Sequence, residues 1–241
     1  GGQPAADVAG RGLGATDVEA KRPGFGLDAG DDLNQLGGGR GPGRARRQQV
    51  LRAHDLGDLA EHGRPAEGDE ASETVARIEE KLGEFDAQIL GKELVGSTAR
   101  FEVTFSGDLQ AFSYAMEHVA KVASIGESLD IVKDVGGAHD VDDTYRVAGF
   151  TGTHGIGHVR LATESEVSPE AGHPFWATGF ADVAIVHNGQ ITNYWKMRRR
   201  LEKRGFEFHT DNDSELIAVY LADKLDQGTP LAAALESSIQ D

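Results

Sequence analysis

The 241-residue sequence contains no cysteine, which excludes disulfide bonds, thiolate metal ligands and a cysteine nucleophile from these residues. It also lacks an excess of basic charge: the formal net charge is -16, whereas proteins that bind nucleic acids carry a basic face. No apolar run reaches the roughly 18 residues of a membrane-spanning helix, and no apolar segment follows a basic start as in a signal peptide. We therefore expect a cytoplasmic protein that binds neither nucleic acid nor membranes.

Aromatic residues are almost missing from residues 1–71, which hold only Phe25, together with half of the 32 glycines. No helical or strand period persists there, and such a composition buries too little apolar area to offset the entropy of ordering. We expect a low-complexity segment that is disordered or non-native, since an out-of-frame reading of GC-rich DNA would give the same mixture. A phosphate-binding loop at 37–43 is the functional alternative, but no Gly-Lys-Ser/Thr closes it.

From residue 72 the hydrophobic pattern predicts regular structure, because helical spacing and strand alternation replace one another along the chain. Residues 72–148 are predicted to form a small α+β insert with helix, strand, helix, strand and short helix at 72–85, 101–105, 109–119, 128–134 and 140–147. Within residues 149–241, strands are predicted at 159–163, 183–186 and 206–208, of which 183–186 is predicted to be buried. Helices are predicted at 193–205, 213–225 and from 230 onward.

Two charged residues have the chemistry to hold the two charged ends of an amino acid. Arg160 follows the glycine-rich run 149–157, and a guanidinium makes two parallel charge-assisted bonds to a carboxylate. Asp213 precedes a predicted helix, where its carboxylate is suited to an ammonium group. Each also has a plain structural interpretation, as a surface arginine on an edge strand and as a helix N-cap, supplied by Asp213 or Ser214. Glu215 is explained by the helix dipole.

The dipeptide Asn188-Gly189 follows an apolar strand and allows two interpretations. Asn-Gly is the strongest short signal for a type I′ hairpin turn. Alternatively, an asparagine amide and a glycine N–H can point at one spot and stabilise a tetrahedral oxyanion, where one such donor contributes about 10²–10³ in rate.

Histidines at 154, 158, 173 and 187 suggest a metal site as a further alternative. A two-histidine zinc site with this spacing needs a helix, and glycines at 155 and 157 disfavour one. We therefore expect no metal ion, and a zinc protein using His154, His158 and His173 is the distant alternative.

Three segments in this order, residues 157–163, 187–193 and 211–217, resemble the class II glutamine amidotransferase domain, which belongs to the N-terminal nucleophile (Ntn) hydrolases. The likeness is closest to glutamate-synthase-like amidotransferase subunits. It is strong over about 149–235, loose over 72–148 and absent from 1–70. It implies an α+β fold, the Ntn αββα sandwich of two antiparallel sheets, incomplete in this chain.

The resemblance also implies roles for single residues. Arg160 would bind the substrate carboxylate, Asp213 its α-ammonium, and Asn188 with Gly189 would form the oxyanion hole, while Thr163 would line the pocket. The substrate would be glutamine, hydrolysed to glutamate without a cofactor, and the ammonia would pass to a synthase domain or subunit.

The sequence departs from the family at the nucleophile, which is a cysteine at the mature N-terminus with its own α-amine as general base. Residue 1 is glycine, and no cysteine occurs elsewhere. We predict that a chain with this N-terminus binds glutamine poorly or not at all and releases no ammonia. It starts without methionine and stops within a predicted helix, so we expect a fragment. A non-catalytic glutamine-binding or subunit-interface module is the alternative function.

Overall fold

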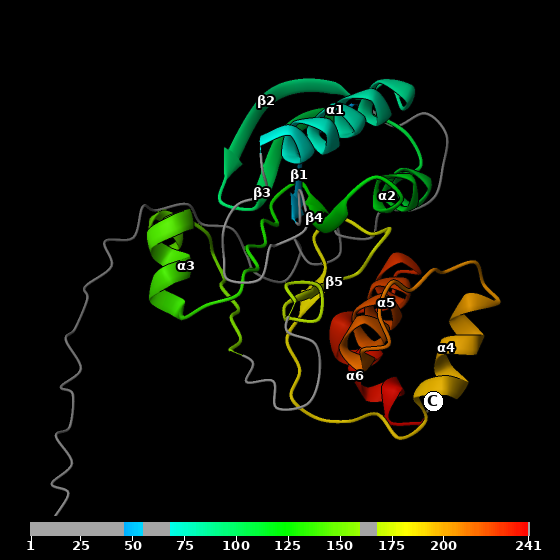
Figure 1. The fold of residues 1–241 in the computed structure, drawn as a ribbon. Helices are drawn as coiled ribbons and strands as arrows, with labels where there is room; N and C mark the ends of the chain where they lie inside the picture. Colours follow the sequence, from blue (N-terminus) through cyan, green and yellow to red (C-terminus); the bar gives the residue numbers. More distant parts are fainter. Residues whose placement is uncertain (1–45, 55–67, 160–167, 241) are drawn as a thin grey trace, which may run out of the picture.

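The computed structural model describes residues 46–54, 68–159 and 168–240, arranged as in Figure 1. In chain order the elements are β1 (Arg47–His54), α1 (Gly68–Glu84), β2 (Gln88–Val95), β3 (Thr98–Phe105), α2 (Leu109–Glu117), β4 (Lys121–Gly126), α3 (Ala138–Tyr145), η2 (Val147–Gly149), β5 (Phe175–Trp176), β6 (Ala184–Ile185), α4 (Tyr194–Glu202), α5 (Asp213–Asp226) and α6 (Leu231–Ser238). The sheets are antiparallel, which confirms an α+β fold. No helix within these ranges is long and apolar enough to cross a membrane.

Four strands form the larger sheet in the order β2-β3-β1-β4. Strand β1 lies inside this sheet, where Leu51 pairs with Phe101 of β3 on one side and with Ile125 of β4 on the other. The expectation that residues 1–71 have no regular structure is therefore wrong for β1 and for the first turn of α1. Residues 1–45 and 55–67 lie outside the described ranges.

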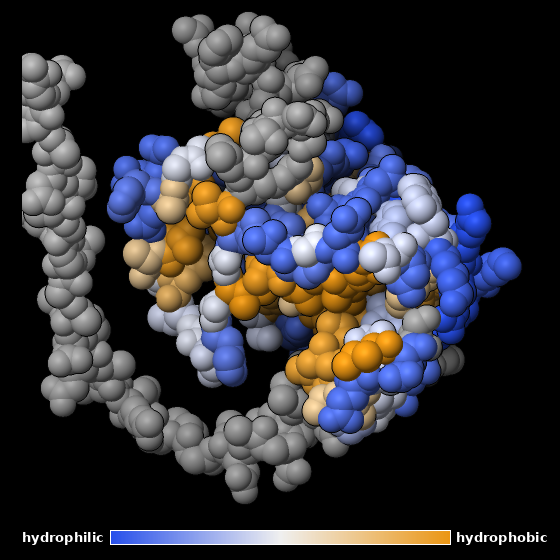
Figure 2. Space-filling model, turned by 90° about the horizontal axis from the view of Figure 1, so that it is seen from below, coloured by the Kyte–Doolittle hydropathy of each residue, from blue (hydrophilic) through white to orange (hydrophobic). Residues whose placement is uncertain are grey.

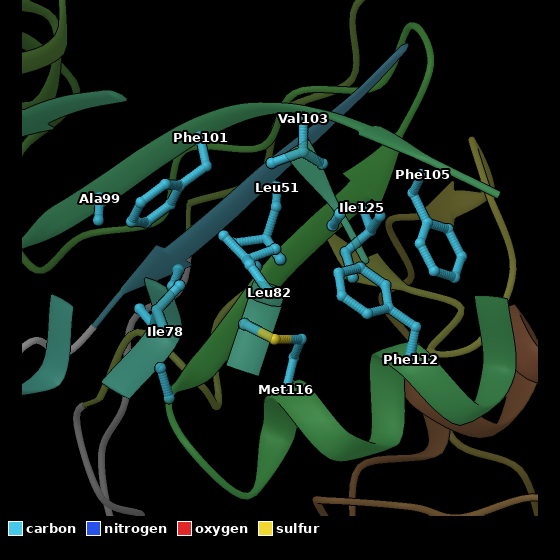
Figure 3. Packing of buried hydrophobic residues seen from close by; sticks show 14 of the residues in the cluster. Leu51, Ile78, Leu82, Ala99, Phe101, Val103, Phe105, Phe112, Met116 and Ile125 are labelled. Carbon is cyan, nitrogen blue, oxygen red and sulfur yellow. The ribbon is translucent and has the colours of Figure 1, made fainter. Parts of the chain in front are cut away.

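Helices α1 and α2 cover one face of this sheet, as predicted from the apolar spacing of 72–85 and 109–119. Figure 3 shows Leu51 and Phe101 of the sheet pointing toward Ile78 of α1 and Met116 of α2. All four side chains are fully buried. Burying one side chain of this size contributes about 1.5–3 kcal/mol. The packing of α1 and α2 on the sheet forms the main core of the first half of the chain.

The opposite face of the sheet is polar and is held by a carboxylate from the segment that crosses it. Arg52 donates through Nε and one terminal nitrogen to the two oxygens of Asp130, over 2.6 and 3.0 Å, and Arg100 donates to the same carboxylate. The strand predicted at 128–134 is wrong: this segment has no ladder partner. Ile131 of this segment is instead buried in the core, and Leu129 packs against it.

A second part is built from the two-stranded sheet β5-β6 and helices α4, α5 and α6. Ala177, after β5, packs against Ala218 and Ala222 of α5, and these small side chains let the backbones approach closely. The predicted strand at 183–186 shrinks to Ala184–Ile185 and is half-buried, so the prediction of a buried strand is wrong. No strand forms at 206–208, where Phe206 is instead a buried anchor for α4 and α5.

The carboxylate of Asp182 joins the two parts. It accepts hydrogen bonds from the main-chain N–H groups of Ser128 and Leu129, each over 2.8 Å, and from that of Glu127. Asp182 itself has a positive φ of 60°, which turns the loop before β6 toward the end of the larger sheet. The position of β6 is thereby tied to the first half of the chain.

Apolar residues also reach the surface. Figure 2 shows them gathered in the middle of the face seen from below, between charged margins. Helix α6 and its C-terminal end carry three exposed apolar side chains at spacings of four residues, Leu231, Leu235 and Ile239.

Candidate functional site

The structure brings two of the three predicted site segments together. Asn188 and Gly189 lie in an exposed loop after β6, and Asp213 is the first residue of α5. The main-chain N–H of Ile191 donates to Oδ2 of Asp213 over 2.9 Å, so the loop and the helix start form one unit. Arg160 and Thr163 fall outside the described residues.

The structural interpretation of Asp213 as the N-cap of α5 is wrong. Asn212 takes that position, and its side chain accepts from the N–H of Ser214 over 2.9 Å. The Asp213 carboxylate therefore lies in the first turn of α5 without capping the helix, and the helix dipole stabilises its negative charge there. Its side chain is 19% exposed, and Oδ1 lies 3.6 Å from Nδ1 of His187.

The hairpin interpretation of Asn188-Gly189 is wrong. A type I′ turn requires positive φ at both central residues, and neither residue has one. Strand β6 also pairs with β5, which precedes it, so the dipeptide does not connect two paired strands. Glycine is needed at 189 for space: a Cβ there would lie 2.7 Å from Nε2 of His187.

Glu215 and Arg198 shape the loop that leads into α5. The buried Glu215 carboxylate accepts from the N–H groups of His209 and Thr210, both over 2.8 Å, and from the Thr210 hydroxyl. Its role is thus to hold this loop, beyond the favourable interaction with the helix dipole. Arg198 of α4 donates to the Thr210 carbonyl over 2.8 Å and to Asp211 over 2.7 Å.

Sequence reasoning noted His158, His173 and His187 only as possible metal ligands and missed the cluster that they form with Ser214 behind Asp213. Nε2 of His173 lies 2.7 Å from Oγ of Ser214, which lies 3.3 Å from Nδ1 of His187. The ring of His158 lies against that of His173, with centroids 4.3 Å apart. Burial lowers the pKa of His173 to about 4, helped by His158 and by the ammonium of Lys133. The residues come from separate segments, so no spacing signal could have found them.

The cluster is not arranged as a metal site. Within the described part of the chain, no group of three or more histidine, aspartate or glutamate side chains is placed to hold a metal ion. His154, counted in the zinc alternative, is exposed and pairs with Thr153 through Nδ1 over 2.9 Å.

Buried charges of opposite sign lie near the cluster. Burial raises the pKa of Glu117 to about 8 and lowers the pKa of Lys133 to about 8, and the nearby Glu117 partly offsets the cost of burying the Lys133 ammonium. The Lys133 ammonium donates to the carbonyl of Glu170 over 3.3 Å and lies 4.9 Å from the ring centre of Phe175. This pair places a positive group close to His173 and so disfavours a second one there.

Residues 158–236 match the model of a family described as a glutamine amidotransferase domain. A putative glutamine amidotransferase of Methanothermobacter thermautotrophicus is 43% identical over 141 residues, which are 55% of this chain and 46% of that protein. The glutamine amidotransferase-like protein GlxB of Rhizobium meliloti is 39% identical over 134 residues, 56% of this chain and 44% of that protein.

A glutamine–fructose-6-phosphate aminotransferase (isomerizing) of Methanothermobacter thermautotrophicus is 34% identical over 119 residues, which are 49% of this chain and 20% of that protein. The chain thus spans less than half the length of each of these curated relatives.

Proposed function

Because the chain belongs to the class II glutamine amidotransferase family through residues 158–236, we propose that the protein binds glutamine and hydrolyses its side-chain amide to glutamate and ammonia. The ammonia passes to a synthase domain or subunit, a proposal supported by relatives named glutamine–fructose-6-phosphate aminotransferases. The proposed reaction uses no cofactor.

The hydrogen bond from Ile191 N–H to Asp213 carries this proposal. It fixes the distance between a carboxylate and the Asn188-Gly189 loop, the two features that glutamine needs at its two ends. An amino acid that is bound by its α-ammonium at Asp213 then presents its far end to a defined part of the loop. Such positioning is a large part of what an enzyme contributes to rate.

Asp213 is suited to the ammonium. Oδ2 is occupied by the Ile191 N–H, while Oδ1 faces His187 at 3.6 Å, beyond normal hydrogen-bond length. Hydrogen bonds between charged groups contribute about 1.5–3 kcal/mol. Partial burial of the carboxylate strengthens such a bond, because water screens it less.

Asn188 and Gly189 are proposed to stabilise the oxyanion. Both are exposed, and the loop conformation is not a hairpin turn, so their donor groups are not committed to a strand partner. Amide and main-chain N–H donors in such a loop match the requirement for preorganised donors where charge develops.

Arg160 is proposed to bind the substrate carboxylate and Thr163 to line the pocket. His158, two residues before Arg160 in the sequence, lies against His173, which in turn bonds Ser214 beside Asp213. The larger sheet and the β5-β6 sheet are proposed to correspond to the two sheets of the αββα sandwich.

A second function has one observation in its favour. The 241 residues contain no cysteine, and hydrolysis through a thioester needs one. A glutamine-binding or subunit-interface module would use Asp213, Asn188 and Arg160 without turnover.

The experiment is to measure ammonia release and L-glutamine binding with the same purified 241-residue chain. Weak, saturable binding detected by NMR, without ammonia release, is expected for these residues alone. Ammonia release would overturn the prediction that this polypeptide does not hydrolyse glutamine. If glutamine causes no perturbation at the Asn188 and Asp213 amides even at tens of millimolar, where binding would contribute only about 2 kcal/mol, the assignment of the site to glutamine fails.

A further inference from the structure

Three side chains from separate segments form a continuous line that ends beside the proposed ammonium site. Starting in the loop before β5, His173 contacts Ser214 through Nε2 over 2.7 Å. Ser214 is almost fully buried in the first turn of α5, and its Oγ lies 3.3 Å from Nδ1 of His187. Nδ1 of His187 in turn lies 3.6 Å from Oδ1 of Asp213.

The direction of these bonds follows from proton counting. A serine hydroxyl has one proton, so between two imidazoles it donates to one and accepts from the other. Among the residues that the structure describes, buried Nδ1 of His173 has no hydrogen-bond partner. A bare lone pair is tolerated there better than an N–H without an acceptor, because unpaired buried N–H groups are the rarer of the two. The proton of His173 therefore sits on Nε2, and His173 donates to Ser214.

The same count fixes the tautomer of His187. Since Ser214 accepts from His173, its own proton is directed to Nδ1 of His187, which becomes an acceptor. The proton of neutral His187 then sits on Nε2, the atom that faces the α-carbon side of Gly189. With this tautomer His187 has no N–H to give to Asp213, and Oδ1 of the carboxylate is left for another donor.

We propose that His173 is a positioning residue that acts through Ser214 to fix the tautomer and orientation of His187, and that this keeps His187 from pairing with Asp213 in place of the substrate ammonium. The inference rests on the proposed function, because it assigns the ammonium to Asp213. It extends that function by giving the site a built-in competition between a histidine and the substrate.

The charges around the line support this direction. His173 faces His158, Lys133 and His187, and only Asp213 among its charged neighbours favours a second positive charge. Burial and these neighbours keep the pKa of His173 near 4, so His173 is neutral at physiological pH. A neutral His173 carries one N–H, on Nε2, and the direction of the hydrogen bonds from His173 through Ser214 to His187, here called the relay, depends on this donor.

Acid reverses the arrangement. Once His187 is protonated, both ring nitrogens carry a proton, and Nδ1–H can turn to Asp213 as an ion pair. A protonated His187 thus competes with the substrate ammonium for the Asp213 carboxylate, which lies 3.6 Å from Nδ1.

The test is an NMR measurement of the histidine ring tautomers, without glutamine, in the wild-type chain and in variants of Ser214 and His173. Ser214→Ala removes the hydroxyl, and His173→Phe removes the donor while keeping a ring. Both are expected to move His187 away from the pure Nε2–H tautomer, because the Ser214 hydroxyl is absent from the first variant and is no longer committed to donating to Nδ1 of His187 in the second. His173→Gln, which keeps an N–H donor at a similar distance, is expected to restore the wild-type tautomer, as a purely steric role of His173 would not require.

The outcome that overturns the proposal is an unchanged tautomer of His187 in either Ser214→Ala or His173→Phe. Should Ser214→Ala fail to fold, His173→Phe against His173→Gln gives the same comparison. His154→Gln is the matched control, since this exposed histidine contacts Thr153 and lies outside the line. Because this readout needs no ligand, absence of glutamine binding in every variant would count against the proposed function and not against the relay.

Discussion

The N–H of Ile191 and the carboxylate of Asp213, 22 residues apart in sequence, are joined by a 2.9 Å hydrogen bond. This bond leaves one carboxylate oxygen for a ligand and fixes the loop that carries Asn188 relative to α5.

Asp213→Asn is expected to weaken L-glutamine binding by about 10- to 100-fold, since a charge-assisted bond contributes roughly 1.5–3 kcal/mol. NMR titration measures this in the millimolar range. Asp211→Asn is the control: that carboxylate is 78% exposed and pairs with Arg198. A glutamine analogue without the α-amine should bind wild type and Asp213→Asn alike. Equal affinity of both chains for glutamine itself would show that Asp213 does not hold the ammonium.

Gly189→Ala is expected to displace the His187 ring, because the new Cβ would lie 2.7 Å from Nε2. The side-chain NMR signals of His187 should shift, and glutamine affinity should fall by about tenfold or more, as for misplaced groups in a preorganised site. Gly155→Ala is the matched control, since a Cβ there meets nothing within 4 Å. If both variants behave like wild type, close packing of His187 on Gly189 is unimportant.

Arg198→Ala is expected to destabilise the chain by about 1–3 kcal/mol and to loosen the loop before α5, because Thr210 and Asp211 lose a charged donor. Urea unfolding measures the first effect. Faster amide exchange at residues 209–212 would reveal the second. Arg199→Ala, an exposed neighbour on α4, should change neither. A loss of stability without faster exchange in the loop would restrict the role of Arg198 to α4.

His54→Phe is expected to reduce acid sensitivity. Burial, together with Lys133 and Lys121, lowers the pKa of His54 to about 3 from 6.5. Between these values the unfolded chain binds a proton that the folded chain excludes, so stability falls as pH decreases through this window, by at most about 1.4 kcal/mol per pH unit.

The measurement for His54 is the free energy of unfolding at pH 7, 5 and 4. Wild type should lose more stability than His54→Phe on going from pH 7 to 4, with little difference in slope above pH 7. His139→Phe, on the exposed surface of α3, is the control and should keep the wild-type slope. Identical slopes in all three chains would contradict the assignment of acid sensitivity to His54.

The sequence predicts helices better than strands in this chain, for physical reasons. Spacing of apolar residues located α1 and α2, whose buried faces follow the helical period, and also α5, which is buried nearly all round from Ser214 to Asp223. Strand β2 was missed because it is an edge strand with mostly exposed side chains, so no alternation marks it. Strand β1 was missed because its short alternation sits in a segment whose composition otherwise indicates disorder.

The site shows a similar division. Asn188, Gly189 and Asp213 could be chosen from the sequence because their order along the chain resembles a family, and the structure brings them together. Ser214 and His173 could not, because their contact is set by how the loop before β5 packs on α5. The capping role assigned to Asp213 was wrong because Asn212 offers a better-placed acceptor one residue earlier.

Because α5 is buried, the part of the site on this helix is more rigid than the part on the exposed loop. The helix that starts with Asp213 continues as the best-packed helix of the second part, from Leu216 to Ala222. A shift of Asp213 would therefore disturb the core, whereas the exposed side chain of Asn188 can adjust at little cost while the Ile191 N–H holds the loop backbone to Asp213. In the proposed site, the carboxylate that binds the α-ammonium group is therefore rigid, and the amide at the other end is adjustable. Selection for an α-amino acid would depend on Asp213, and adaptation to ligands of different length would depend on Asn188.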